Sequence, residues 1–310
     1  MCLCPHLRTP IVVLTLFVIA GCSSATFDAA TAPPHSVPRA TVSVPGHVYL
    51  VRGLVGEIFS LGFYDLSARI KERGVNASVH SMYAPGLLGN QIISVYRRAP
   101  APIVLIGHSS GADAVIAVAE QLKAADVPVT TMFGFDPTPI AGRVPENVEL
   151  FINLYQKTNL IGGGEAKAAS GFRGRIVNVD LRDRHEIVHI TLDKSVVLHN
   201  LVADKIAAVL RATAHPPEPA RGRKEKTGAS PYAYVIPVAM RYVVPPDVPI
   251  VLWDSAVRET IGPDETLEGF AARTGSPAWA IASINSVIAA DPPLPGSVLL
   301  VPRSADDAGP

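Results

Sequence analysis

One short segment of the chain combines a nucleophilic side chain with the composition of a sharp turn. Residues 107–111 are Gly-His-Ser-Ser-Gly, with an apolar run before them and an amphipathic pattern after them. This pattern predicts a buried strand, a tight turn and a helix, with Ser109 at the turn. Such a turn leaves no space for side chains two residues before and two residues after the serine, which accounts for Gly107 and Gly111. We therefore expect Ser109 to act as a nucleophile.

The predicted surroundings of Ser109 also suit a developing negative charge. The serine lies at the start of a helix, where the helix dipole and the free N–H of Ser110 can stabilise an oxyanion. A serine hydroxyl is a weak nucleophile without a base. An acid and a histidine are therefore expected further along the chain, in that order.

Short apolar runs alternate with helical patterns on both sides of this motif. The runs predicted as strands cover residues 47–51, 77–82, 102–106, 127–135, 148–154 and 175–181. The helical patterns cover 61–73, 112–124 and 193–211. This alternation predicts an α/β fold with a mostly parallel sheet and helices on both faces. Strands that are almost entirely apolar are typical of a sheet covered on both faces.

Residues 47–212, with the motif and its flanking elements, resemble the α/β-hydrolase superfamily of lipases and esterases. The resemblance implies that a Ser-His-Asp triad cleaves a carboxylic ester or thioester without a metal or organic cofactor. In this family the histidine lies between the last strand and the last helix, where His185 and His189 both fit. We prefer His189, because it lies just before the expected helix cap Asp193.

The acid that the resemblance implies is Asp136. Residues 133–137 are Phe-Gly-Phe-Asp-Pro, similar to the Gly-Leu-Asp-Pro segment of the pancreatic-lipase branch, where the acid lies at this strand. Asp180 and Asp183 remain alternatives, although they precede His189 by only nine and six residues.

The same resemblance places the second oxyanion donor in the turn after the first strand, at the N–H of Leu54. Many relatives have His-Gly where residues 52–53 are Arg-Gly, a difference that leaves the turn in place. The short connection after Asp136 predicts a minimal, uncapped hydrolase domain. The Gly-rich residues 157–174 are either a mobile flap or a surface loop.

The N-terminus has the pattern of an export signal. Residues 11–20 are apolar but too few to span a bilayer as a helix. Residues 19–22 are Ile-Ala-Gly-Cys, which resembles the bacterial lipoprotein box. The resemblance implies a signal peptide over 1–21 and lipid attachment at Cys22, followed by a flexible tether over 22–46. The expected location is the bacterial cell envelope, at the outer membrane or the periplasmic face of the inner membrane.

The C-terminal third has a different organisation. Residues 213–231 are rich in proline and charge and predict a linker, while 232–257 predict only short β segments. Residues 258–303 resemble a LysM module, a small βααβ fold that binds N-acetylglucosamine polymers such as peptidoglycan. The family usually begins Gly-Asp-Thr-Leu, whereas residues 264–267 are Asp-Glu-Thr-Leu.

Composition excludes several other functions. The chain has 27 basic and 27 acidic residues and is 6% aromatic, which argues against nucleic acid as a partner. Its three cysteines all lie within the first 22 residues, so the globular part has no Cys-based metal site. The remaining alternative to an esterase is a peptidoglycan-binding lipoprotein that uses a degenerate hydrolase fold as a scaffold.

Overall fold

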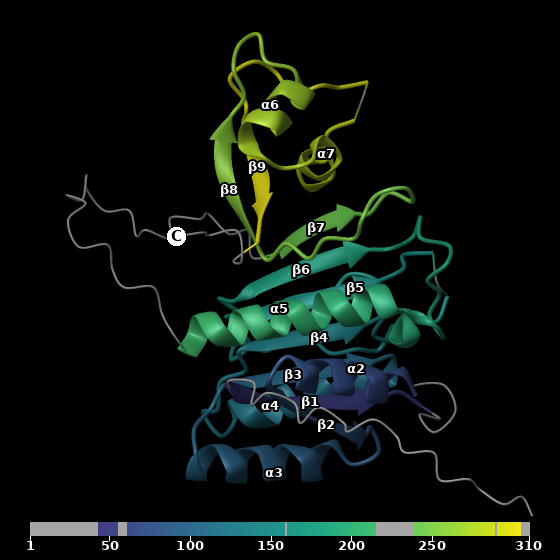
Figure 1. Ribbon diagram of the computed structural model, residues 1–310, viewed down its shortest axis with the longest axis vertical. Helices are drawn as coiled ribbons and strands as arrows, with labels where there is room; N and C mark the ends of the chain where they lie inside the picture. The colour runs from purple at the N-terminus through teal and green to yellow at the C-terminus, as the bar shows by residue number, and fades with distance from the viewer. Residues whose placement is uncertain (1–42, 55–60, 159, 215–238, 289, 305–310) are drawn as a thin grey trace, which may run out of the picture. The chain divides into compact units, whose positions relative to one another are not determined.

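The computed structural model of the chain describes residues 43–54, 61–158, 160–214, 239–288 and 290–304. The signal peptide, Cys22, most of the expected tether and the expected linker lie outside these ranges. Within them, a seven-stranded sheet has the order β2-β1-β3-β4-β5-β6-β7, and every neighbouring pair is parallel (Figure 1). The predicted α/β fold with a mostly parallel sheet is confirmed.

The strands and helices of this sheet domain have the following bounds. The strands are β1 (Val44–Arg52), β2 (Val75–Ser81), β3 (Ile103–His108), β4 (Thr131–Phe135), β5 (Leu150–Tyr155), β6 (Arg175–Asp180) and β7 (Ala239–Val243). The helices are α2 (Gly62–Glu72), α3 (Pro85–Arg98), α4 (Ser110–Lys123), the 3-10 turn η1 (Leu192–Lys194) and α5 (Val196–Ala214).

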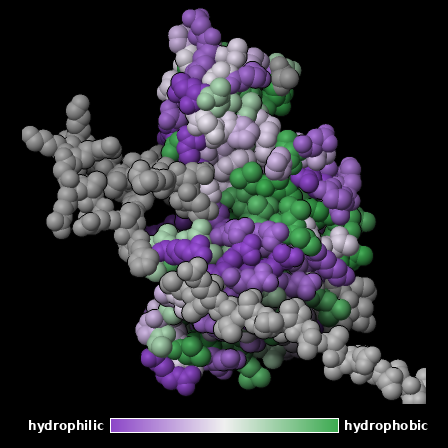
Figure 2. All heavy atoms as spheres, viewed as in Figure 1, coloured by the Kyte–Doolittle hydropathy of each residue, from purple (hydrophilic) through white to green (hydrophobic). Residues whose placement is uncertain are grey.

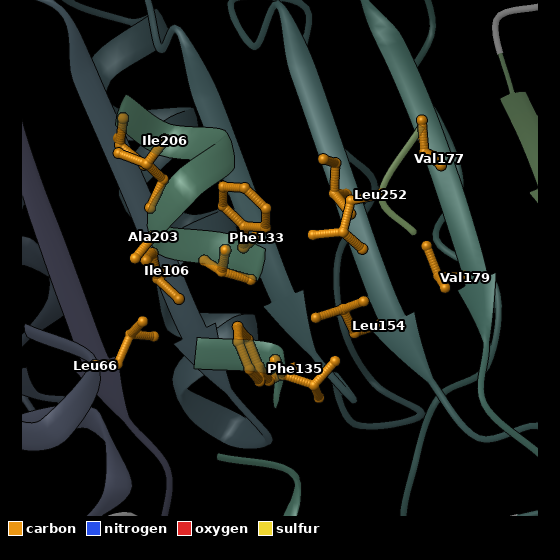
Figure 3. Packing of buried hydrophobic residues seen from close by; sticks show 14 of the residues in the cluster. Leu66, Ile106, Phe133, Phe135, Leu154, Val177, Val179, Ala203, Ile206 and Leu252 are labelled. Atoms are coloured by element: carbon orange, nitrogen blue, oxygen red, sulfur yellow. The ribbon is translucent and has the colours of Figure 1, made fainter. Parts of the chain in front are cut away.

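Successive side chains of each central strand enter different cores, because strand side chains alternate between faces. In β1, Val48 and Leu50 pack under α2 and α5, whereas Tyr49 and Val51 pack under α3 and α4. Figure 3 shows part of the first core, which includes Phe133 of β4 and Ala203 of α5. Two buried faces explain why these strands are apolar at almost every position.

The sheet domain differs from the prediction at both of its ends. Strand β1 begins at Val44, inside the expected tether, because Val44 pairs with Val75 across a bulge at Gly46. The domain also continues beyond residue 212, because β7 pairs in parallel with β6. The sequence predicts only short β segments over residues 232–257, and β7 is one of them. Helix α3, over Pro85–Arg98, was not predicted at all.

The C-terminal residues form a separate two-stranded sheet with its own helices. Its elements are β8 (Ser255–Thr260), α6 (Leu267–Thr274), α7 (Ala278–Asn285) and β9 (Val298–Arg303), with β8 and β9 antiparallel. Thr266 caps α6 by accepting a hydrogen bond from the Gly269 N–H at 3.1 Å. Gly275 ends the helix in a left-handed conformation with φ of 70°. The β-α-α-β order predicted for this segment is present.

A buried charge network joins α5 to the segment that enters this C-terminal unit. The Lys205 ammonium lies 3.2 Å from the Asp254 carboxylate, and both side chains are almost fully buried. The Arg175 guanidinium lies 3.9 Å from the same carboxylate. The Lys205 ammonium also donates to Ser304 Oγ, next to the end of β9. Each charge is thus compensated away from water.

Lys205→Met should therefore destabilise the protein strongly. Breaking a buried pair from one side leaves an uncompensated charge and typically costs about 3–5 kcal/mol. Asp204→Ala on the same helix is a matched control, because its ion pair with Arg73 leaves the aspartate side chain 68% exposed. Such exposed pairs contribute about 0–1 kcal/mol. Urea unfolding measures both, and equal losses would contradict the prediction.

Candidate active site

The strand-turn-helix motif predicted around Ser109 is present. Ser109 follows β3 directly and precedes α4, with φ of 55° and ψ of −127°. A non-glycine residue in this region stores about 1–3 kcal/mol of strain, which the surrounding structure must offset. A Cβ on Gly107 would overlap the backbone of Gly111 and Ala112, and one on Gly111 would overlap the Val51 carbonyl oxygen. Both glycines are therefore required by close packing.

The loop after β6 brings His189 to this serine. His189 Nε2 lies 3.0 Å from Ser109 Oγ, although the two residues are 80 positions apart in the chain. The imidazole is largely buried, whereas Ser109 is only partly buried and is open to a substrate. The nucleophile and its base are thus within hydrogen-bond distance.

The third predicted residue holds the other side of the imidazole. His189 Nδ1 lies 2.8 Å from Asp136 Oδ2, and Asp136 is fully buried at the end of β4. Asp136 has a left-handed φ of 50°, which aspartate tolerates better than most residues. Gly162 lies against its carboxylate, where a Cβ would overlap Oδ1. The Gly-rich loop therefore packs on the acid of the site.

These contacts define the protonation pattern that nucleophilic catalysis needs. With Nδ1–H donated to Asp136, the Nε2 lone pair faces the Ser109 hydroxyl and can accept its proton. The buried carboxylate then stabilises the imidazolium that forms. The arrangement is suited to attack by Ser109 on an acyl carbonyl.

The alternative residues lie elsewhere. His185 is exposed in the turn after β6. Asp180 is buried but accepts hydrogen bonds from the Arg182 guanidinium, with Arg182 Nε at 2.7 Å. Asp183, in the same turn, is partly exposed. Among the candidates in the described residues, Asp136 and His189 are the ones whose side chains link to Ser109 Oγ.

The two expected oxyanion donors differ in their surroundings. Ser110 is the first residue of α4, where helical N–H groups have no carbonyl partner within the helix. The Leu54 N–H instead donates to Ser110 Oγ at 2.7 Å. Leu54 therefore lies beside the turn as expected, but its N–H already has a side-chain acceptor.

A second pair of buried titratable groups lies behind His189. His108 Nε2 is 2.8 Å from the His189 carbonyl oxygen, and its Nδ1 is 4.0 Å from Asp193 Oδ1. Asp193 Oδ2 accepts the Gly62 N–H at 3.2 Å, and the Asp193 carbonyl oxygen lies 2.6 Å from His199 Nε2. His108 therefore ties the turn at Ser109 to the loop that carries His189.

Asp193 has a different role from the one predicted. It was expected to cap the last helix, but it lies in η1, and α5 starts only at Val196. Ser195 Oγ accepts the Leu198 N–H at 3.4 Å. His199 is buried in α5.

Burial shifts the pKa values of this second pair in opposite directions. It lowers the pKa of His108 to about 4 and raises the pKa of Asp193 to about 6. Lys194 opposes the second shift, because its charge favours the ionised carboxylate. At neutral pH the histidine is neutral, and the carboxylate is the charged member of the pair.

These shifts predict two opposing dependences of stability on pH. Between about pH 4 and 6.5 the unfolded chain binds more protons at residue 108, so this histidine makes stability rise with pH. Between about pH 4 and 6 the folded chain binds more protons at residue 193, so this aspartate makes stability fall with pH. His108→Gln removes the histidine, so the fall in stability with pH that Asp193 causes should remain. Asp193→Asn removes the carboxylate, so the rise in stability with pH that His108 causes should remain. The check is the urea unfolding midpoint of the wild type and both variants from pH 4 to 7. If both variants changed the slope of midpoint against pH in the same direction relative to the wild type, the prediction would be contradicted.

Among the described residues, no three or more His, Cys, Asp and Glu side chains form a group that could hold a metal ion. In that part of the chain, no helix is long and apolar enough to cross a bilayer.

Comparisons with known proteins find similar folds at low sequence identity. No family model matches the sequence, and no curated protein matches it. Human thioesterase 2 superposes with a TM-score of 0.37 at 12% identity, covering 56% of this chain and 99% of that one. A thioesterase domain from the nocardicin cluster gives 0.36 at 16% identity, covering 55% and 95%.

A third solved structure is described as a hydrolase of the alpha/beta superfamily, from Xanthomonas campestris pv. campestris. It gives a TM-score of 0.31 at 17% identity, covering 54% of this chain and 99% of that one. Because all three TM-scores are below 0.5, these structures do not indicate the activity or substrate of this chain.

Two features of the site were not anticipated from the sequence. The bond from His108 to the His189 carbonyl joins residues 81 positions apart, and no local pattern signals it. The packing of Gly162 against Asp136 had one available signal, the run of three glycines at 162–164. A run of glycines can indicate a close approach of the backbone to another group, and not only a flexible loop.

Proposed function

We propose that the protein is a serine hydrolase that cleaves a carboxylic ester or thioester through Ser109, His189 and Asp136. The observation that carries the proposal is the continuous pair of contacts at 3.0 and 2.8 Å from the Ser109 hydroxyl through the imidazole to a fully buried carboxylate. The strained backbone of Ser109 supports it, because such strain concentrates at functional residues.

The reaction follows from the positions of these groups. Ser109 Oγ attacks the carbonyl carbon while its proton passes to His189 Nε2, and the Ser110 N–H stabilises the oxyanion. The tetrahedral intermediate collapses when Nε2 gives that proton to the leaving oxygen or sulfur. A water molecule then gives a proton to Nε2 and attacks the acyl-enzyme. Ser109 leaves with the proton, and the acid product is released.

An active-site-directed fluorophosphonate tests the nucleophile directly. We expect the wild-type protein to be labelled at one serine and to hydrolyse p-nitrophenyl acetate. Ser109→Ala should lose both properties and keep the wild-type circular dichroism spectrum. Equal labelling of the two proteins would overturn the proposal, and so would an unchanged hydrolysis rate in the variant.

A second function, binding of N-acetylglucosamine polymers by the C-terminal unit, is favoured by a groove there. The groove has a volume of about 550 Å³ and is lined from α7 by Ala278, Trp279 and Ala282. Residues 261, 265–268, 287–288 and 292–293 form the rest of its lining. An aromatic side chain in a groove with polar neighbours such as Glu268 suits the faces and hydroxyls of a sugar chain. We propose peptidoglycan as the ligand.

Filling the groove tests this second function. Ala282→Arg places a long side chain in the groove, whereas Ala272→Arg makes the same change at an exposed position of α6 outside its lining. We expect sedimentation with purified peptidoglycan for the wild type and Ala272→Arg, and its loss for Ala282→Arg. Co-sedimentation of all three proteins would contradict the assignment to the groove.

The proposed cellular location rests on the N-terminal sequence. We propose that the chain is anchored in the bacterial envelope through lipid on Cys22, a residue outside the described ranges. Labelling of cells with a palmitate analogue should tag the wild type but not Cys22→Ser. With the anchor and the groove both engaged, the hydrolase domain would be held close to the cell wall at high effective concentration.

A further inference from the structure

Large apolar side chains are exposed around the candidate active site. They come from the segments that follow β1, β4, β5 and β6, at the edge of the sheet where parallel strands end. We define the apolar rim as Leu54, Leu61, Ile140, Leu160, Val188 and Ile190. The exposed fractions reach 89% at Ile140 and 97% at Leu160. Figure 2 shows apolar residues exposed in several places on one face of the molecule, some of them on the side to which the strand arrows of Figure 1 point.

Contacts in the site tie the segments of the rim to the triad. Val188 and Ile190 flank His189 in the chain. The Leu54 N–H binds Ser110 Oγ, next to the nucleophile. Leu160 lies two residues before Gly162, which packs on the Asp136 carboxylate.

The Ile140 segment is tied to the helix that begins at the nucleophile. The Thr138 N–H, two residues before Ile140, donates to Asp113 Oδ1 on α4 at 3.0 Å. The segments that carry Leu54, Ile140, Leu160, Val188 and Ile190 are therefore held beside the groups that surround Ser109.

The chemistry of the rim selects what it can bind. Its side chains offer no hydrogen-bond donor or acceptor, so they would leave the hydroxyls of a sugar unpaired. An alkyl chain, in contrast, gains free energy from each methylene that it removes from water. The substrate must also deliver a carbonyl to Ser109, and an acyl chain attached to that carbonyl begins at the centre of the rim.

We propose that the acyl half of the substrate is a medium-length or long fatty acyl group, which lies on the apolar rim while Ser109 attacks its carbonyl. This inference rests on the proposed function and adds the substrate class. A chain on an open surface buries about half of each methylene, so kcat/KM should rise roughly twofold per methylene.

A series of p-nitrophenyl esters from acetate to decanoate, each below its critical micelle concentration, tests the inference. We expect kcat/KM to rise about 250-fold across the series. A flat or falling series would overturn this inference but leave the proposed hydrolase in place. Failure to hydrolyse any ester, together with no fluorophosphonate labelling, would overturn the proposed function and this inference with it.

Two variants assign the preference to the rim. In Ile140→Ser/Leu160→Ser, the ratio of kcat/KM for decanoate to that for acetate should fall at least about tenfold. Val298→Ser is the matched control, because Val298 is 59% exposed on β9 and lies outside the rim. It should leave the ratio at the wild-type value. An unchanged ratio in the double variant, or an equal fall in the control, would overturn the assignment.

Discussion

Replacing His189 with alanine should lower kcat/KM for p-nitrophenyl acetate by at least about 10⁴-fold. The imidazole is within 3.0 Å of Ser109 Oγ, so its loss leaves the hydroxyl without a base. It also leaves the departing group without a proton donor. Stability should fall as well, because the buried Asp136 carboxylate loses its hydrogen bond from Nδ1 and the largely buried imidazole leaves a gap. Steady-state kinetics and urea unfolding of the same preparation separate the two effects.

His185→Ala is the matched control for this variant. His185 lies four residues away in the same loop but is exposed, so its substitution should change the rate by less than about twofold. A large loss in His185→Ala with near-normal rates in His189→Ala would mean that the loop rearranges in solution. The alternative histidine would then be the base.

The parts of the fold that could be predicted from the sequence are those set by local sterics or by burial on both faces. The turn at Ser109 needs glycine at 107 and 111 because backbone from other segments lies against both positions. This requirement is visible as a motif. The central strands were recognisable because residues such as Val48 and Tyr49 are buried on opposite faces, which leaves no polar alternation.

Helix α3 was missed, and β7 was predicted only as one of several short β segments without a place in the sheet, because both depend on partners that are distant in sequence. Helix α3 contains Gly86 and Gly89 and buries only three residues, so its own pattern is weak. It packs against α4, where Gln121 Nε2 donates to Asn90 Oδ1 at 2.7 Å. Strand β7 has five residues and gains its backbone hydrogen bonds from β6, far back in the chain. Neither the packing of α3 on α4 nor the pairing of β7 with β6 can be recognised from local hydrophobic periodicity.

The candidate site shows the same division. Ser109, Asp136 and His189 were predicted together because each has a recognisable place in a strand-helix order, and the structure brings the three side chains into contact. Asp136 was preferred because its segment resembles Gly-Leu-Asp-Pro, and His189 because it precedes the expected helix cap Asp193, a residue that the structure places in η1. His108 could not be placed, because its bond to the His189 carbonyl depends on how a loop folds back over β3.

Asp136→Asn should lower kcat by roughly 10⁴-fold while changing KM little. Asparagine has almost the same shape as aspartate, so the buried position at the end of β4 remains filled. Its amide can donate to His189 Nδ1, which stabilises the tautomer with a proton on Nε2, the wrong nitrogen for accepting the Ser109 proton. The substitution also removes the charge that stabilises the imidazolium. Because Asp136 is fully buried behind the imidazole, substrate binding should be nearly unaffected.

Asp183→Asn provides the matched control, since Asp183 was an alternative acid and is partly exposed in the turn after β6. Its kcat should stay within about twofold of the wild type. A loss in Asp136→Asn that appeared mainly in KM would contradict the assigned role, because it would place the carboxylate in contact with substrate. Equal kcat values in the two variants would mean that Asp136 is only a buried structural acid. The split between kcat and KM therefore distinguishes a group that orients the imidazole from one that merely fills the end of the strand.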